Sequence, residues 1–398
     1  MKENFLFTSE SVTEGHPDKM CDQIADAVLD GFLVQDPFSH VIAECAVANG
    51  VIFIASRFES QARVDIPQIA RQVIGQIGYE DDHFNAKSCT VMNSFTDLPA
   101  IASPRWDERD MDDPQIERIT AKDHANVFGY ACRQTPAMLP LPIWLAHRLA
   151  RRVASHEVRK HLPYLALDAK TQVGIEFRNR RPYRIHSLTL VASQTRRSHP
   201  SPQQLRQDLI DHVISHVFRD EEFRPDERTH IFINPEGPVI TGGPALHAGL
   251  TGRKNAIDTY GEYSRHSGAA LSGKDPTRID RVGAYAARYV AKNIVAAGLA
   301  EECEVQLSYS IGLARPVSIM VETFGTGKRR GAEIAALLDS CFDLRPAGIL
   351  RQFNLRFLPQ QRKGFYRHLA AYGHLGRPEL NLPWEAIDKV PDLQNLFH

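Results

Sequence analysis

The sequence predicts an α+β protein made of three similar helix, antiparallel hairpin, helix domains with pseudo-threefold symmetry. Pairs of β-rich runs are joined by short polar turns, and these pairs recur about 130 residues apart. Segments with helical spacing of apolar residues flank each pair. Because a short turn joins antiparallel strands, the hairpins favour this class over an alternating βαβ sheet.

The hairpins are predicted from their turn residues. The first spans residues 40–58, where VIAECAVA and VIFIASRF flank Asn49-Gly50, a pair that accepts the positive φ angles of a type I′ turn. The second spans 171–193 and the third 304–323, each around a polar turn that contains proline. Helices are predicted at 18–35, 66–77, 141–160, 202–218, 276–299 and 331–338. The expected domains are 1–110, 111–235 and 236–398.

The composition is that of a folded, globular protein. The 398 residues include 47 basic and 48 acidic side chains, with 43% hydrophobic residues, which excludes disorder and coiled coils. A formal net charge of −1 removes the field that non-specific nucleic-acid binding needs, so we expect no nucleic-acid partner. No apolar run approaches the roughly 18 residues of a membrane span, and we expect a cytoplasmic protein with no membrane partner. Six cysteines without a C-x-x-C pair predict reduced thiols.

The segment EGHPDK, residues 14–19, is the first candidate for chemistry. Asp18 stands where a helix begins and can cap it, but His16, Asp18 and Lys19 can equally bind a metal and a phosphoester. The segment alone leaves both interpretations open. Three aspartates continue at four-residue spacing: Asp22, Asp26 and Asp30. The last two are predicted to lie on a solvated acidic face.

Three later segments combine glycines with cations: GLTGRK at 249–254, GAALSGKD at 268–275 and GTGK at 325–328. Together they fit a phosphate cradle, since glycine lets backbone N–H groups approach and the cations neutralise oxygens. The middle segment nearly matches a P-loop, but Asp275 replaces the magnesium-binding hydroxyl and no buried strand precedes it. Asp275 and Asp280, close to Lys274 and Arg278, can instead hold magnesium on a polyphosphate.

Two other patterns are weaker. Lys170 follows Asp168 at the start of the second hairpin and can add a phosphate contact, although a lone lysine at a strand end is usually solvated. His212 and His216 share a helical face, but the glutamate of H-E-x-x-H is missing, which disfavours a zinc site.

These residues, in this order, resemble the S-adenosylmethionine synthetase family, from FTSESV at 7–12 to AYGH at 371–374. The most specific stretches are EGHPDK, FGYA (128–131), DAK (168–170), GLTGRK, SGKDP (272–276) and AYAARYVAKNIVAAGLA (284–300). The resemblance implies three similar α+β domains with active sites between two subunits. It therefore implies a homodimer or homotetramer whose small-molecule partners are ATP and an amino-acid-like acceptor.

The resemblance also implies a reaction in which the sulfur of methionine attacks C5′ of ATP. The triphosphate leaves and is cleaved to pyrophosphate and phosphate. Because sulfur needs no general base, catalysis rests on orientation and on neutralising the leaving polyanion.

Roles for particular residues come from the same resemblance. Asp18 and Asp280 are expected to hold Mg²⁺, Glu44 to bind K⁺, and His16 to lie beside the reacting C5′ oxygen. The residues expected to clamp the triphosphate or contact the nucleotide are Lys19, Asp123, Asp168, Lys170, Arg253, Lys254, Lys274 and Arg278.

The sequence departs from the family where methionine is recognised. Arg57 replaces a glutamate that receives the amino group of methionine, and His247 replaces the aspartate before GLTGRK. TAKDHA (120–125) replaces GAGDQG and keeps only its aspartate, Asp123. Leu98 and its neighbours stand where the family has QSPDI. Val239 replaces a stacking aromatic residue, and Arg278 replaces a lysine near the methionine carboxylate. An acceptor pocket formed by Arg57, Leu98 and His247 favours an acceptor with an anionic group.

Three functions follow from these patterns. The first is adenosyl transfer from ATP to methionine or a related nucleophile. The second is ATP or triphosphate hydrolysis, with water replacing the acceptor. The third is a catalytically weak regulatory paralogue that binds nucleotide or an active synthetase subunit. The retained cluster of charged residues argues against the third, because a scaffold has no need for so many like charges together.

Overall fold

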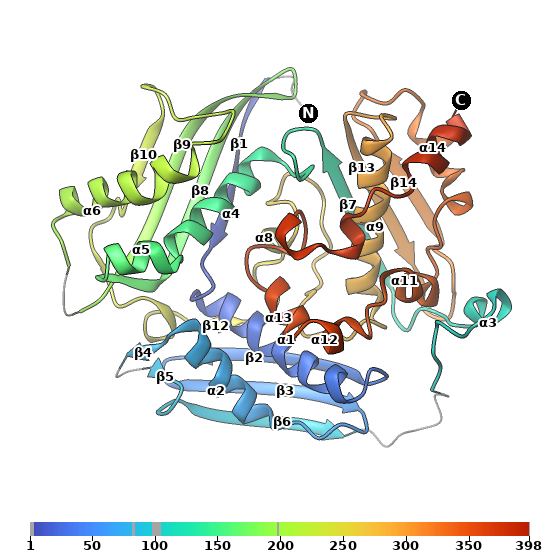
Figure 1. Ribbon diagram of the computed structural model, residues 1–398, viewed down its shortest axis with the longest axis horizontal. Helices are drawn as coiled ribbons and strands as arrows, with labels where there is room; N and C mark the ends of the chain where they lie inside the picture. The colour runs from blue at the N-terminus through green and yellow to red at the C-terminus, as the bar shows by residue number, and fades with distance from the viewer. Residues whose placement is uncertain (1–3, 82–83, 98–104, 197–198, 398) are drawn as a thin grey trace.

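Three sheets surround a central group of helices in the computed structural model of the chain (Figure 1). The structure describes residues 4–81, 84–97, 105–196 and 199–397. Each sheet is built on one of the three predicted hairpins, and the mixed helix and sheet content confirms the α+β prediction. The helices α1 (Pro17–Gln35), α4 (Leu141–Val153) and α9 (Ile279–Ala296) each pack against one sheet.

The first sheet has the order β12-β2-β3-β6. Its strands are β2 (His40–Ala48), β3 (Val51–Glu59), β6 (Thr90–Asp97) and β12 (Gly249–Leu250). Asn49 adopts a φ of +50° in the β2–β3 turn, as the type I′ prediction requires. Alternate residues of β2, such as Ala43 and Cys45, are buried against α1 and leave the other face of the sheet open.

The second and third sheets repeat this plan. The second contains β1 (Phe5–Val12), β8 (Leu165–Arg178), β9 (Arg181–Gln194), β10 (His230–Ile233) and β11 (Val239–Ile240). The third contains β7 (Ala125–Cys132), β13 (Glu302–Tyr309) and β14 (Ser318–Glu322), and a small hairpin joins β4 (Glu80–Asp81) to β5 (Phe84–Asn85). Parallel strands extend two of the hairpins, since β6 pairs with β3 and β10 with β9.

The strands that precede the three main helices are exchanged in a cycle. β1 precedes the first hairpin in the sequence but pairs antiparallel with β8 of the second hairpin. β7 pairs in the same way with β13 of the third, and β12 closes the cycle by pairing with β2 of the first. The domain boundaries at 110 and 235 stay a prediction, but the sheets themselves are not made from contiguous segments. No sequence pattern predicts this exchange, because a lone strand has no neighbouring turn that identifies its partner.

Two long predicted helices are interrupted. The predicted helix 141–160 divides at Ser155, whose side chain accepts a hydrogen bond from the Val158 N–H and caps α5 (His156–His161). The predicted helix 202–218 contains a π-helical turn between α6 (Pro202–Leu209) and α7 (Ser215–Val217). The remaining helices are α2 (Ile66–Ile77), α3 (Asp113–Glu117), α8 (Asn255–Asp258), α10 (Gly331–Ala335), α11 (Pro346–Phe353), α12 (Leu358–Gln361), α13 (Phe365–Leu369) and α14 (Val390–Phe397).

The predicted solvated face of α1 is wrong. Asp26 is fully buried and receives two hydrogen bonds from Arg281, at 2.7 and 3.1 Å. Asp30 is also buried and accepts from the backbone N–H groups of Tyr366 and Arg367. These aspartates face segments near the C-terminus rather than water, and periodicity within α1 could not reveal that cover.

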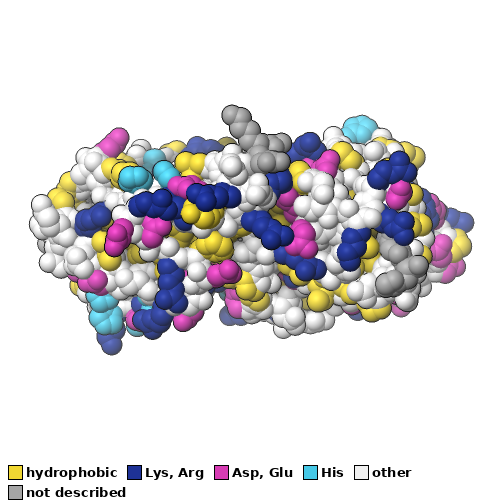
Figure 2. All heavy atoms as spheres, turned by 90° about the horizontal axis from the view of Figure 1, so that it is seen from above, with side chains coloured by type: hydrophobic (Ala, Val, Ile, Leu, Met, Phe, Trp, Pro, Cys, Tyr) yellow, Lys and Arg dark blue, Asp and Glu magenta, His cyan; other side chains and the backbone are white. Residues whose placement is uncertain are grey.

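One face of the molecule mixes both signs of charge (Figure 2). On the face drawn in Figure 2, basic and acidic side chains are interspersed. All six cysteines are free and buried. Among the described residues, no helix has the length and apolar composition that crossing a membrane requires.

We expect Asp26→Ala to lower the free energy of unfolding by about 3–5 kcal/mol, because it leaves the Arg281 guanidinium buried without its counter-ion. Glu333→Ala is the control, since its ion pair with Arg330 is exposed and its loss should change the free energy of unfolding far less. Denaturant unfolding of the three proteins measures both effects. Equal effects of the two substitutions would contradict the role given to the buried pair.

Candidate active site

The EGHPDK segment lies where β1 ends and α1 begins. The helix starts at Pro17 and its N-cap is His16, whose Nδ1 accepts a hydrogen bond from the Asp18 N–H at 3.2 Å. Asp18 is therefore not the N-cap residue of α1, so the interpretation of this aspartate as a helix cap is wrong. Its buried carboxylate accepts from the Leu250 N–H and pairs with the Arg253 guanidinium at 2.9 Å. Asp18 thus joins α1 to the GLTGRK segment.

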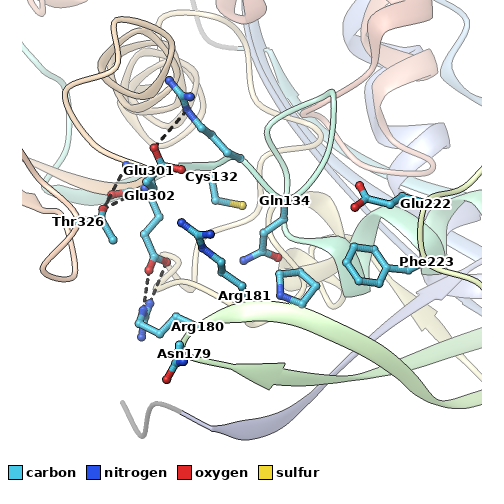
Figure 3. A pocket seen from close by; sticks show the side chains of 12 residues that line it. Cys132, Gln134, Asn179, Arg180, Arg181, Glu222, Phe223, Glu301, Glu302 and Thr326 are labelled. Carbon is cyan, nitrogen blue, oxygen red and sulfur yellow. Dashed lines mark hydrogen bonds and ion pairs between the residues drawn. The ribbon is translucent and has the colours of Figure 1, made fainter.

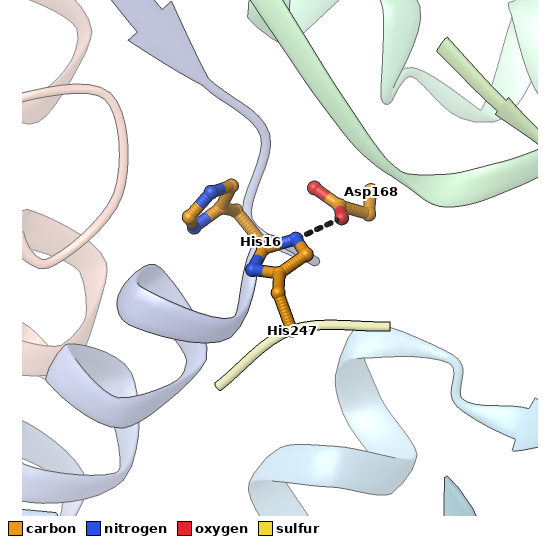
Figure 4. A group of neighbouring side chains, drawn as sticks. All are labelled: His16, Asp168 and His247. Carbon is orange, nitrogen blue, oxygen red and sulfur yellow. Dashed lines mark hydrogen bonds and ion pairs between the residues drawn. The ribbon is translucent and has the colours of Figure 1, made fainter. Parts of the chain in front are cut away.

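Asp168 and His247 lie next to His16 (Figure 4). Asp168 Oδ2 accepts from His247 Nε2 and from the Gly243 N–H, both at 2.9 Å. The rings of His16 and His247 have centroids 5.0 Å apart. The structure therefore brings together three residues that were predicted separately, as a reaction-centre histidine, a nucleotide contact and an acceptor contact.

Electrostatics in this group favour a neutral imidazole beside an ionised carboxylate. Burial lowers the pKa of His16 to about 4, although the charges of Asp168 and Asp18 oppose the change. Burial raises the pKa of Asp168, but the hydrogen bond from His247 and the neighbouring charges outweigh it and hold that pKa below its usual value. His16 consequently carries no charge at neutral pH. With Nδ1 occupied by the Asp18 N–H, its own proton lies on Nε2.

Lys19 has a different place from the one predicted. Its ammonium is fully buried and pairs with Asp22 at 2.9 Å and with Asp258. These carboxylates outweigh burial and raise the pKa of Lys19. A cation enclosed in this way has no surface left for a nucleotide, so Lys19 acts as an interior counter-ion. Asp258 stands in a segment without a recognisable motif, so no local pattern predicts its pairing with Lys19.

Lys274 and Asp280 form a second charged group. The Lys274 Nζ lies 2.8 Å from Asp280 Oδ2, and both side chains are partly exposed. The neighbouring Asp275 is fully buried and accepts from the Val41 and Thr277 N–H groups, so its carboxylate holds loops together and is not free to bind magnesium. Arg278 is the N-cap residue of α9, with its Nε 4.0 Å from Asp275.

The glycine-rich segments differ from the predicted cradle. The N–H groups of Gly252 and Gly273 donate to the carboxylates of Asp22 and Asp26, so they serve the fold rather than a phosphate. No P-loop forms, because Gly273, at a φ of +79°, lies in a loop held against β2. The GTGK segment (325–328) lies beside residues 299–302 instead, where Thr326 closes a turn. The N–H groups of Gly252 and Gly273 are therefore engaged within the protein, and phosphate binding by the cations of the first two segments stays a prediction.

The other predicted residues lie mostly at the surface. Lys170 is exposed within β8, where it pairs with Val12 of β1 and Val191 of β9, and Asp123 is exposed before β7. Lys254 pairs with Glu10 at 2.9 Å. Glu44 and Arg57 are exposed on the same open face of the first sheet, because Ile42 pairs with Arg57 and Glu44 with Ala55. Leu98 falls outside the described residues.

A cavity of about 530 Å³ lies away from these groups (Figure 3). The β8–β9 turn and the start of β13 line it, and an ion pair between Arg180 and Glu302, at 2.6 Å, stands in its wall. None of the predicted site residues lines this cavity, so its volume is no guide to the reaction site.

Carboxylate oxygens of Asp18 and Asp280 suit Mg²⁺, which prefers one or two carboxylates together with phosphate oxygens. Each is paired with a cation, Arg253 or Lys274, of a kind that also binds phosphate. The donor chemistry therefore fits a magnesium polyphosphate. Glu44 supplies an exposed carboxylate oxygen, which is a hard ligand suited to K⁺.

The class of this protein is defined by three α+β domains, which exchange strands and surround a charged site. Residues 4–99, 118–239 and 241–386 match the N-terminal, central and C-terminal domains of S-adenosylmethionine synthetase. The chain therefore belongs to the S-adenosylmethionine synthetase family.

Full-length relatives agree. The chain is 47% identical to the S-adenosylmethionine synthase of Gloeothece citriformis, over 100% of this chain and 98% of the relative. It is 49% identical to that of Thermosynechococcus vestitus, over 98% and 97%, and 49% identical to that of Trichormus variabilis, over 99% and 97%.

We expect His16 to make the folded protein less stable as the pH falls. Its folded pKa of about 4 lies below the value of about 6.5 in an unfolded chain, so between these values the unfolded chain binds a proton that the folded chain does not. Relative to His16→Gln, the wild type should lose about 3 kcal/mol of unfolding free energy between pH 7 and pH 4. Denaturant unfolding at several pH values tests this. Parallel curves for the two proteins would show that His16 titrates normally.

Proposed function

We propose that the protein transfers the 5′-adenosyl group of ATP to methionine or a related nucleophile and releases pyrophosphate and phosphate. The observation that supports this most is the pair of cation and carboxylate couples, Arg253–Asp18 and Lys274–Asp280, on glycine-rich segments beside β2. Relatives named S-adenosylmethionine synthase support the same reaction.

In this proposal, phosphate oxygens replace the carboxylates as partners of Arg253 and Lys274. The freed carboxylates then hold Mg²⁺, which supplies additional positive charge to the leaving triphosphate. Lys170 and Lys254 add exposed or partly exposed ammonium groups from β8 and the GLTGRK segment. The neutral His16 ring donates its Nε2 proton in a hydrogen bond toward the oxygen that leaves C5′. Orientation and charge neutralisation account for catalysis without a general base.

A second copy of the chain completes the site in this proposal. The Asp18 carboxylate is bonded to the Leu250 N–H and the Asp280 carboxylate to Lys274. Leu250 and Lys274 pair with Ala46 and Ile42 of β2, which are about 13 Å apart along the strand, so the two carboxylates approach β2 at separate points. The open face of the first sheet also exposes apolar side chains: Val51, Phe53, Met92 and Leu250. Such a face is typical of a protein interface, which agrees with a homodimer or homotetramer.

Arg57 stands on that face and is proposed to select the acceptor. Its side chain is exposed. A guanidinium only donates hydrogen bonds, so it favours a carboxylate or another anionic group on the acceptor. Six unpaired cysteines agree with a cytoplasmic site of action.

Lys274→Ala and Asp280→Asn should each lower ATP turnover by at least about a hundredfold with the fold retained, because both act on charge that develops on the triphosphate. Lys328→Ala is the matched control, since Lys328 follows a glycine in the GTGK segment but is exposed away from β2. Steady-state kinetics with mass spectrometry of products measures the effects. Near-wild-type rates in either variant would contradict the proposed triphosphate clamp. Loss of ATP without an adenosylated product would identify a hydrolase.

Arg57→Glu should weaken binding of the preferred acceptor by about 2–5 kcal/mol and leave ATP affinity nearly unchanged. Kinetic constants of wild type and variant, with methionine and with the best anionic acceptor found in a panel, test this. Arg228→Glu is a control for the charge change, because Arg228 is exposed in the loop before β10, a strand of the second sheet. Unchanged acceptor constants in Arg57→Glu would rule out this role.

A further inference from the structure

A small cavity of about 200 Å³ lies between α4 and the segment 372–379, which follows α13. Three arginines line it: Arg148 and Arg151 from one face of α4, and Arg377 from the segment opposite. Glu379 is the one acidic residue among its lining residues. None of these residues is among those assigned above to ATP, metal or acceptor, so the cavity is separate from the candidate active site.

The positive charges around this cavity exceed the negative ones. Arg151 Nη1 and Arg377 Nε lie 3.0 and 2.5 Å from the same oxygen, Glu379 Oε1, so two guanidiniums share one carboxylate. Arg148 pairs with Glu221, which stands outside the lining. Burial lowers the pKa values of Arg148 and Arg377, and the charge of Arg151 lowers both further. The three guanidiniums are therefore close enough to repel one another, and an additional anion would relieve that repulsion.

One N–H group of the cluster also lacks an acceptor. The Nε of Arg151 is enclosed and, among the described residues, has no hydrogen-bond partner, although buried polar atoms in folded proteins nearly always have one. The positive field extends to His147 on the same helix. Burial, followed by the charges of Arg151, Arg377 and Lys19, holds the pKa of His147 well below its usual value, so this ring adds no charge of its own.

We propose that this cavity binds a free oxyanion with the size and charge of phosphate. A guanidinium presents several N–H groups in a plane that matches phosphate oxygens, and Arg151 and Arg148 supply such groups. Arg377 donates its Nη1 to the carbonyl oxygens of Ala371 and Gly373 at 2.7 and 3.2 Å, so it mainly contributes charge. The volume lies below the roughly 300 Å³ at which pockets begin to take drug-sized ligands, which favours a free anion over a nucleotide. The site does not depend on the proposed adenosyl transfer.

Equilibrium dialysis of full-length protein against labelled inorganic phosphate, at low ionic strength, tests the site. The Lys274→Ala variant separates it from the proposed triphosphate clamp and should still bind one phosphate per chain. Adding Arg151→Gln should weaken that binding at least about tenfold, the effect of losing a charge-assisted hydrogen bond. Adding Arg159→Gln instead should leave it unchanged, since Arg159 is also a partly exposed arginine but does not line the cavity. Absence of bound phosphate in Lys274→Ala, or equal losses in the two arginine variants, would overturn the proposal.

A change of opposite sign is expected at Glu379. In the Lys274→Ala protein, Glu379→Gln removes the carboxylate that competes for Arg151 and Arg377 and keeps the side-chain size, so phosphate should bind at least about threefold more tightly. A purely structural role of the ion pairs predicts no gain. ATP should not displace this phosphate from the Lys274→Ala protein, because the cavity is too small for a nucleotide. Weaker binding in Glu379→Gln, or displacement by ATP, would contradict a phosphate site here.

Discussion

The cyclic exchange of β1, β7 and β12 is the constraint on which the rest of the structure depends. Each of these strands supplies backbone hydrogen bonds to a sheet whose hairpin comes from another third of the chain. Each sheet therefore needs a segment from elsewhere for one of its edges, and the three thirds are tied together before any side chain is considered. The exchange also creates the site, because β1 delivers His16 to the start of β8, and β12 brings the GLTGRK segment to the start of α1.

Two kinds of charged group occur on α1. In its first turn, Asp18 pairs with Arg253, whose side chain remains partly exposed. Lys19 in the same turn and Asp26 two turns later are fully buried, and Asp26 pairs with the buried Arg281 of α9. A buried ion pair contributes little net stability, but removing one partner is costly, so these pairs fix which segments cover the helix. The acidic repeat on α1 consequently combines groups available to a ligand with groups that specify the fold.

The neutral state of His16 follows from its place at the start of α1. Burial keeps the imidazole uncharged at physiological pH, and its Nδ1 accepts the helix-cap hydrogen bond from the Asp18 N–H. The Nε2 proton is therefore the one that the ring can donate to a ligand. Asp168 orients the neighbouring His247 ring through its hydrogen bond to Nε2.

The sequence by itself determined the local structure and the family. Turn residues such as Asn49 and the apolar spacing of α1 act over a few residues, so they fixed the hairpins and the main helices. Motifs such as EGHPDK identified candidate functional side chains. Only the tertiary structure decided which glycine N–H groups serve the fold, that Lys19 is enclosed, and that His16, Asp168 and His247 meet. Those outcomes depend on contacts between residues more than 70 positions apart, such as the hydrogen bond between Asp168 and His247, and no local pattern encodes which distant segment will cover a side chain.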